Sequence, residues 1–218
     1  AGLSHAPVGT SHTRLKPRII ASQKTISTPE SSYESLTAMK RWKTICTLDE
    51  IRGKVVTCML CPRLVEYREG VAAEKKSAFK DWQYWGKPVP GFGDPNAQLV
   101  IVGLAPAAHG GNRTGRVFTG DPTSQFLMHH LHMAGFANKP TSEHIHDGLK
   151  LKGAYMTAAV KCAPPNNRPN SREIANCTPY LAKELKTIKS ARVVLVLGRI
   201  AFDATLQALH SPHLTRKS

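Results

Sequence analysis

Four cysteines occur in the sequence as two pairs, which is typical of a metal or cluster site. Cys58 and Cys61 form a C-x2-C pair, whereas Cys162 and Cys177 form a C-x14-C pair, each at the expected boundary of an element. Thiolates in such positions bind zinc or an iron–sulfur cluster, and spacing alone leaves both open. Cys46 lies outside both pairs, and we expect it to be a free thiol. The odd number of cysteines without a secretion signal argues against a disulfide framework.

A long glycine-rich loop, 104–123, follows the first predicted strand and carries one histidine, two arginines, one phenylalanine and one aspartate. Glycines let the backbone approach a ligand closely, and its N–H groups can meet an anion or a carbonyl oxygen. The loop lacks the Lys-Ser/Thr end of a Walker motif, and its glycine spacing differs from a Rossmann fingerprint. Long loops inside compact domains are usually functional. We therefore expect a ligand site that does not hold a nucleotide cofactor.

The elements that must position these residues alternate between helices and strands. Apolar, non-alternating runs predict strands at 99–103, 154–160 and 192–197. Apolar residues at helical spacing and capping signals predict helices after Thr47, from Pro62, over 124–135, after Asn170 with an interruption or restart at Pro179, and over 200–209. This order indicates an α/β fold, a three-layer α/β/α sandwich with a central parallel sheet. Ligands then bind outside the carboxyl ends of the strands, where the loops 104–123 and 161–169 lie.

Charge and length bound the class of protein. The 218 residues predict one domain over 33–209, with a disordered Ser-, Thr- and Pro-rich tail at 1–32 and a frayed end at 210–218. The net charge of +15 favours a polyanionic partner, nucleic acid first, although a generally basic surface is the plainer alternative. No apolar run approaches the ~18 residues of a membrane span. We expect an intracellular monomer without membrane contact, and the acid-poor tail leaves organellar targeting or a basic DNA-binding arm open.

Four motifs resemble those of the family-five, UDGb-type, uracil-DNA glycosylases. They are GLAPAAHGGNRTGRVFTGD at 103–121, CMLCPRLV at 58–65, YWGKPVPGFG at 84–93 and TAAVKCAPPNN at 157–167. The resemblance covers about Leu48 to Leu209. It implies the α/β/α fold of the glycosylase superfamily and a [4Fe-4S] cluster on the four paired cysteines, with zinc as the alternative. It also implies hydrolysis of the N-glycosidic bond of uracil in DNA, with other deaminated bases such as hypoxanthine accepted.

Taken with the loop chemistry, the resemblance assigns the catalytic roles to two side chains. Asp121 would position or activate the water, unless it only caps the following helix. Asn167 would help with the water or the sugar, unless it is an ordinary turn residue. Enzymes of this kind act on a base flipped out of the duplex. They need hydrogen-bond donors for the leaving base and a placed water for the sugar.

The remaining assignments concern the pocket and the loop. Phe118 would stack on the flipped base, or else pack under the loop. Small residues, Ala158 and Ala159, stand where family-four enzymes carry a uracil-reading asparagine, which predicts a roomier pocket. Backbone N–H groups of the strand end would contact the base carbonyls, at Gly103, Leu104 and Ala105. Four loop residues would hold phosphates or shape the loop: His109, Asn112, Arg113 and Arg116.

One expected family segment is not found in the sequence. It would contain a further strand and a His-Pro-Ser motif, whereas residues 209–213 read Leu-His-Ser-Pro-His directly after a helix. We do not assign the histidine of that motif to His210. The sequence therefore predicts a sheet that lacks its last edge strand, and weak or no activity for this chain. The alternative function is a catalytically impaired DNA-binding domain with an iron–sulfur or zinc site.

Overall fold

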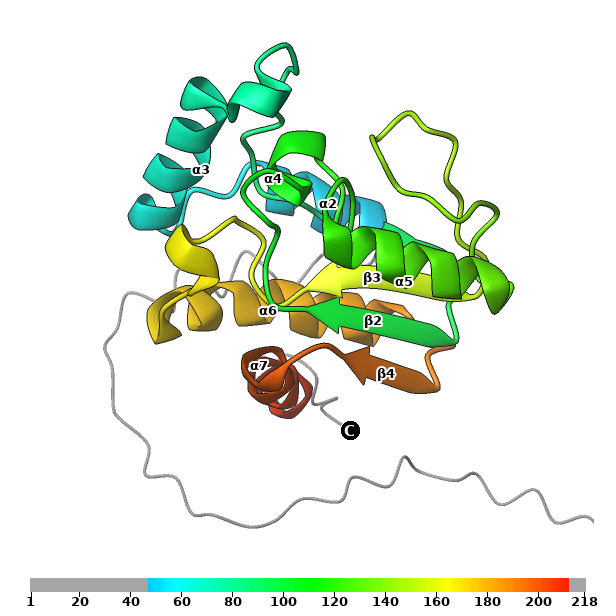
Figure 1. The fold of residues 1–218 in the computed structure, drawn as a ribbon. Helices are drawn as coiled ribbons and strands as arrows, with labels where there is room; N and C mark the ends of the chain where they lie inside the picture. The colour runs from blue at the N-terminus through cyan, green and yellow to red at the C-terminus, as the bar shows by residue number, and fades with distance from the viewer. Residues whose placement is uncertain (1–46, 212–218) are drawn as a thin grey trace, which may run out of the picture.

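The structure, a computed structural model, describes residues 47–211 (Figure 1). The predicted tail, residues 33–46 with Cys46, and residues 212–218 lie outside this part. The elements run in the order α2 (Leu48–Val56), α3 (Pro62–Glu74), η1 (Ser77–Phe79), β1 (Phe92–Gly93), β2 (Leu99–Gly103), α4 (Gly111–Thr114), α5 (Pro122–Met133), β3 (Ala154–Ala158), η2 (Pro165–Asn167), α6 (Ser171–Thr187), β4 (Val193–Val196) and α7 (Arg199–His210).

The sheet has the strand order β1-β3-β2-β4. β2 pairs in parallel with both β3 and β4, with Gly103 opposite Ala158 at the end of the β2–β3 pair. β1 pairs antiparallel with β3, so the prediction of a wholly parallel sheet is wrong at this edge. The sequence gives no signal for β1 because it has only two residues, both half-buried, in a segment that reads as a loop. At the other edge of the described sheet, Val193 and Leu195 of β4 are 57% and 43% exposed.

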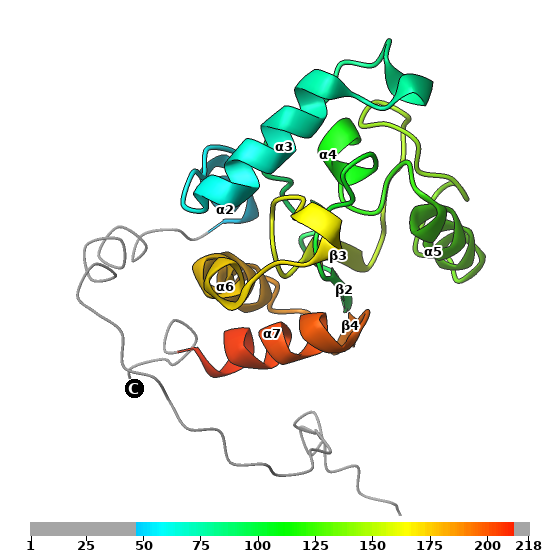
Figure 2. The same ribbon diagram turned by 60° about the vertical axis from the view of Figure 1, so that its left-hand side comes forward.

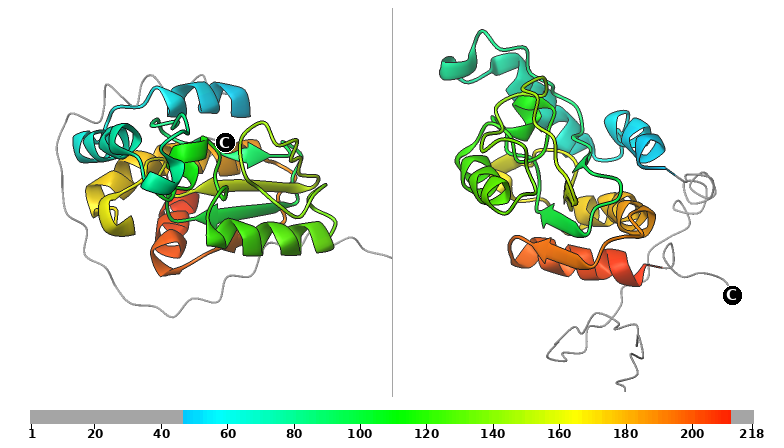
Figure 3. Two further views of the ribbon diagram at one scale, coloured as in Figure 1. Left: turned by 45° about the horizontal axis from the view of Figure 1, so that its top comes forward. Right: turned by 90° about the vertical axis from the view of Figure 1, so that its right-hand side faces the viewer.

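Helices cover both faces of the sheet, which confirms the predicted α/β/α layers. Val100 and Val102 of β2 pack on one face with residues of α6 and α7, and Ile101 packs on the other face with α5. These opposite directions follow from the two-residue period of a strand. Figure 2 shows α5 on one side of the strands and α6 and α7 side by side on the other, and Figure 3 gives two further views of these layers. No helix within 47–211 combines the length and the apolarity needed to cross a bilayer.

Three helices begin at capping boxes, in which the cap side chain and the third helical residue exchange hydrogen bonds with the backbone. The cap residues are Thr47 for α2, Asp121 for α5 and Asn170 for α6. Asp121 therefore starts α5 at Pro122, two residues before the predicted start. The predicted interruption at Pro179 is wrong, because α6 runs unbroken through it. The neighbours Tyr180 and Leu181 are buried, and this packing outweighs the backbone hydrogen bond that proline cannot make.

Candidate functional site

A cavity of about 380 Å³ opens at the carboxyl ends of the parallel strands. The loops after β2 and β3 form most of its wall, which is where ligands bind in open α/β sheets. The structure brings together there seven residues that the sequence analysis assigned to base binding and catalysis: Gly103, Leu104, Ala105, Phe118, Asp121, Ala158 and Asn167. The remaining wall comes from Pro106, Ala107, Val117, Pro122, Thr123 and Leu197.

The Phe118 ring lies against the end of β2 in a conformation that the backbone holds under strain. Its φ is +48°, in the left-handed region that non-glycine residues rarely adopt. A Cβ atom on Gly103 would come within 2.7 Å of the Phe118 ring, so only glycine leaves room for this placement. The ring is half-buried and lines the cavity, so one of its faces is available to a flat ligand.

We expect Gly103→Ala to displace Phe118 and to lower the rate of the reaction at this cavity about tenfold to a hundredfold, because small displacements in a catalytic site cost that much. Gly53→Ala is the matched control, since Gly53 lies on the exposed side of α2 with open space around it. The control is expected to keep full activity and to gain up to about 1 kcal/mol of stability. Rates and melting temperatures of both variants check the prediction, which is contradicted if Gly103→Ala retains wild-type rates.

Asp121 can serve two roles, as the cap of helix α5 and as a carboxylate that acts in the cavity. Its Oδ1 accepts a hydrogen bond from the Ser124 N–H at 2.8 Å, which caps α5. A Cβ atom on Gly110 would lie 2.5 Å from the other carboxylate oxygen, Oδ2, so this glycine makes room for it. Burial raises the pKa of Asp121, and the backbone hydrogen bonds and the nearby Arg113 partly oppose this shift. A cavity-lining carboxylate with a raised pKa is the type of group that acts as a general base.

The loop after β3 places a second polar side chain at the cavity. Asn166 and Asn167 both have left-handed φ, +54° and +55°, which asparagine tolerates better than most residues. Asn167 is exposed and lines the cavity together with the small side chain of Ala158. Ala159, by contrast, packs into the core with α6 and α7, so of these two alanines only Ala158 lines the cavity.

The four loop residues assigned to phosphates or loop shape are held mainly by the protein itself. Arg116 is 3% exposed and forms a double ion pair with Asp147, through oxygens at 2.6 and 3.0 Å. Arg116 also holds the pKa of Asp147 well below its usual range, against the effect of burial. The buried Asn112 donates to the carbonyl of Arg68 at 3.1 Å. These contacts support loop shaping for Arg116 and Asn112 rather than phosphate binding.

His109 and Arg113 are linked within the same loop. Nδ1 of His109 lies 3.0 Å from the Tyr84 hydroxyl, and burial with nearby cations lowers the pKa of His109. The Arg113 Nε donates to the carbonyl of His109 at 2.7 Å, and its Nη2 donates to that of Gly120 at 3.0 Å. Both residues therefore brace the loop from inside, next to Asp121.

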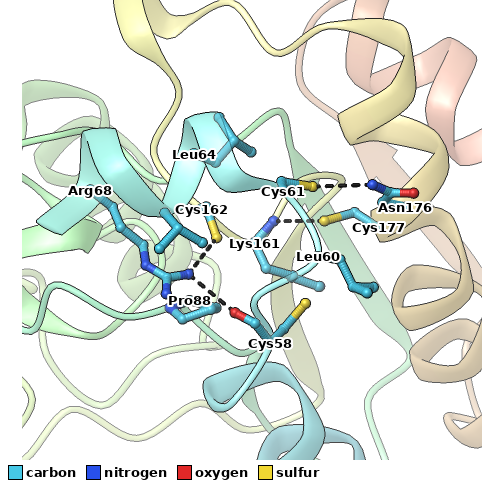
Figure 4. A pocket seen from close by; sticks show the side chains of 11 residues that line it. Cys58, Leu60, Cys61, Leu64, Arg68, Pro88, Lys161, Cys162, Asn176 and Cys177 are labelled. Carbon is cyan, nitrogen blue, oxygen red and sulfur yellow. Dashed lines mark hydrogen bonds between the residues drawn. The ribbon is translucent and has the colours of Figure 1, made fainter.

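The four paired cysteines line one small cavity beneath α3 (Figure 4). All four are free thiols, and N–H donors contact three of the sulfurs. The donors are Asn176 Nδ2 to Cys61 at 3.4 Å, the backbone of Lys161 to Cys177 at 3.5 Å, and Arg68 Nη1 to Cys162 at 3.2 Å. Burial raises the pKa of Cys162 to about 11 and that of Cys177 to about 12. No three His, Cys, Asp or Glu side chains within 47–211 form a group that could hold a single metal ion.

Arg68 is a functional candidate that the sequence analysis missed. Its side chain is 2% exposed, and besides Cys162 it donates to the Cys58 carbonyl at 3.3 Å (Figure 4). It also donates to Met59 Sδ at 3.0 Å. Within residues 47–211 its Nε is buried without a hydrogen-bond partner, and the one ion pair that it forms there is with Glu69, whose side chain is 55% exposed. The signal was present in the spacing, because Arg68 follows Cys61 by two helical turns on α3 and so shares its face.

A buried polar network beside the cysteines was also missed. Lys161 Nζ donates to Glu184 Oε2 at 2.7 Å and to Thr157 at 2.6 Å, and Thr157 donates to the same carboxylate at 2.7 Å. The side chains of Lys161 and Glu184 are only 2% and 1% exposed. The pair joins the loop that follows β3, just before Cys162, to α6, which carries Cys177. Sequence alone gives no reason to pair two residues so far apart.

The sequence was also compared with known proteins. The profile of the family described as the Uracil DNA glycosylase superfamily matches residues 90–217. The chain is 48% identical over 161 residues to a type-5 uracil-DNA glycosylase of Pyrobaculum aerophilum, covering 74% of this chain and 70% of the relative. It is 51% identical over 152 residues to the type-5 enzyme of Thermus thermophilus, covering 70% and 68%. A type-4 enzyme of Sulfurisphaera tokodaii is 30% identical over 156 residues, with 70% and 55% covered.

Proposed function

This chain belongs to the uracil DNA glycosylase superfamily, and within it to the type-5 enzymes, and we propose that it removes uracil from DNA by hydrolysing the base–sugar bond. The observation that carries the proposal is the single cavity that holds Phe118, Asp121 and Asn167 at the strand ends. Such hydrolysis initiates repair of deaminated DNA. The net charge of +15 suits a polyanionic substrate.

Each part of the cavity has a task in this reaction. The flipped uracil stacks on the exposed face of Phe118, and the wall formed by Gly103 to Ala105 faces its edge. Bond cleavage leaves negative charge on the base and positive charge on the sugar, so donors near the base and a water near the sugar lower the barrier. Ionised Asp121 takes a proton from that water, and Asn167 holds the water or the sugar in place.

We propose further that the four cysteines hold a [4Fe-4S] cluster. A tetrahedral zinc ion would require four sulfurs within about 2.3 Å of one point, whereas a cluster binds each sulfur through a different iron. The four thiols line one cavity, which supports one thiolate-bound group there, with zinc as the alternative to the cluster. Such a group would join the α2–α3 junction, the end of β3 and α6, and its role would be structural because hydrolysis transfers no electron.

Arg68 supports the same proposal through its charge. Arg68 has no buried carboxylate partner in the described part of the chain, and a buried guanidinium of this kind is unfavourable unless another negative group compensates it. Cysteine thiolates bound to iron would supply that negative charge at the place where Arg68 Nη1 meets Cys162. The residues present therefore fit an anionic, thiolate-bound group.

We expect Arg68→Met to weaken retention of iron about tenfold to a hundredfold, as loss of outer-sphere partners of metal sites does. Arg68→Lys keeps the charge and is expected to restore part of the affinity. Arg199→Met, on an exposed ion pair of α7, is the matched control. Iron content and visible absorbance during a chelator challenge measure the effect. Equal iron retention in Arg68→Met and wild type would contradict the prediction, whereas zinc in place of iron would contradict the cluster alone.

Two finer statements belong to the same proposal. Ala158 leaves space where a larger side chain would narrow the cavity, and this supports acceptance of other deaminated bases such as hypoxanthine. We also propose that the protein acts on DNA inside the cell, as a monomer, since one chain can supply every side chain assigned to the cavity.

Release of free uracil from a uracil-containing oligonucleotide tests the proposed activity directly. Wild type should release it, and an Asp121→Asn and Asn167→Ala double variant should not. The competing function, an impaired DNA-binding domain with a metal site, predicts binding of the same oligonucleotide without base release. Substitution of hypoxanthine for uracil in the oligonucleotide tests the breadth of the cavity.

A further inference from the structure

A second cavity, of about 700 Å³, lies beside the candidate active site and has no role in the chemistry above. Residues of the α3–β1 segment, of α5 and of the loop 140–144 line it. The two cavities meet at one short segment of the loop, because Phe118 and Asp121 line the first while Gly120 between them lines the second. A DNA strand whose flipped base enters the first cavity therefore passes close to the second.

The wall nearest the active-site loop is an aromatic pair built around a cation. The rings of Phe79 and Trp82 meet edge to face, with centroids 6.2 Å apart. The Arg113 guanidinium lies 3.9 Å from the Phe79 centroid and 4.1 Å from the Trp82 centroid. Both rings are only half-buried and both line the cavity. Arg113 therefore holds the two rings on one side, and their other side is open to the cavity.

Arg113 brings positive charge to this wall, next to the Asp121 carboxylate of the first cavity, and the exposed Glu143 also lines the second cavity. Arg113 is 3% exposed, and its Nη1 has no hydrogen-bond partner in the described part of the chain. None of the ion pairs found within 47–211 includes it. Lys76 and Lys80, beside η1, are exposed and add charge of the same sign. Open aromatic rings next to positive charge are the combination that binds single-stranded nucleic acid, through base stacking and phosphate attraction.

We propose that this cavity binds the nucleotide that neighbours the flipped uracil in the same DNA strand, with its base against Trp82 and its phosphate toward the basic side chains. The proposal rests on the proposed function and deepens it, because it gives the enzyme a binding contact with the strand beside the excised base. His129 of α5, which is exposed and lines the cavity, lies within reach of the same nucleotide.

The test compares binding of two single-stranded probes, an 11-nucleotide strand with a central abasic-site analogue and a trinucleotide core of the same sequence. Trp82→Ala should weaken binding of the long strand about tenfold, within the range for loss of one stacked base. Trp82→Phe keeps a ring and should lose much less. The affinity for the trinucleotide shows how much of the binding comes from the central abasic site and its two immediate neighbours alone.

Two variants that each add a negative charge test the proposal without changing the aromatic rings. His129→Glu adds a negative charge inside the cavity, whereas His130→Glu adds it one residue further on α5, outside both cavities. The first should weaken binding of the long strand several-fold, and the second should not. Melting temperatures show that each variant is folded.

Unchanged affinity in Trp82→Ala and His129→Glu, with both folded, would overturn the proposed subsite. So would equal losses in His129→Glu and His130→Glu. Failure of wild type to release uracil would overturn the proposed function instead, and the binding comparison would still be readable because the abasic probe needs no catalysis.

Discussion

Asp121→Asn is expected to lower uracil excision about 10²- to 10⁴-fold, the usual contribution of a general base, while the fold stays intact. Asparagine is as good an N-cap as aspartate, so the hydrogen bond to the Ser124 N–H survives the exchange. Asp121→Ala removes both roles and is expected to cost a further ~0.5–2 kcal/mol of stability. Single-turnover rates and thermal melts of both variants separate the two roles. A fully active Asp121→Asn enzyme would reduce Asp121 to a helix cap.

The pH dependence of the reaction gives a second view of the same carboxylate. Burial raises the pKa of Asp121, so the wild-type rate should fall, on the acid side, at a higher pH than an ordinary aspartate would give. Asp121→Asn should lose this acidic limb, because no base remains to be protonated. The sign for stability is opposite to that of a paired carboxylate. A raised pKa in the folded state means that ionised Asp121 costs stability near neutral pH, so Asp121→Asn should melt no lower there than wild type.

The seven residues assigned to the base cavity were predictable from the sequence because they stand at the ends of two strands or in the loops that follow them. Apolar runs locate β2 and β3, parallel strands place their carboxyl ends together, and the motifs at those ends then converge. The motifs do not show which of two neighbouring alanines, Ala158 or Ala159, faces the cavity. Ala158 lines it and Ala159 packs into the opposite face, and this depends on where β3 ends.

For two arginines of the loop the sequence named the residue but left its role open, because the partners lie far away along the chain. Arg116 could hold a phosphate or shape the loop, and Asp147 beside it, in a loop without regular structure, favours the second role. The same two roles were open for Arg113, which two aromatic rings of the α3–β1 segment enclose. Positive charge in a motif therefore indicates DNA binding less directly than the net charge suggests, because buried arginines contribute to that charge without facing the solvent.

The Lys161–Glu184 pair leads to the largest expected loss of stability. Lys161→Met leaves the Glu184 carboxylate buried without its cation, which costs about 3–5 kcal/mol in comparable sites. The hydrogen bond from Thr157 remains but supplies no compensating charge. Chemical denaturation should therefore show a clear fall in the midpoint. Arg199→Met, which breaks an exposed pair, should change stability by no more than about 0.5 kcal/mol.

A double-mutant cycle decides whether the loss comes from the pair itself. Glu184→Gln keeps the hydrogen-bond acceptor for Thr157 but removes the charge, so the Lys161→Met/Glu184→Gln protein should recover most of the stability. Additive losses would mean that Lys161 acts through packing alone. The pair joins the segment before Cys162 to the helix that carries Cys177, so iron retention should fall with stability in Lys161→Met and return in the double variant. The same buried pair would then hold the segment that carries Cys162 in place against the helix that carries Cys177.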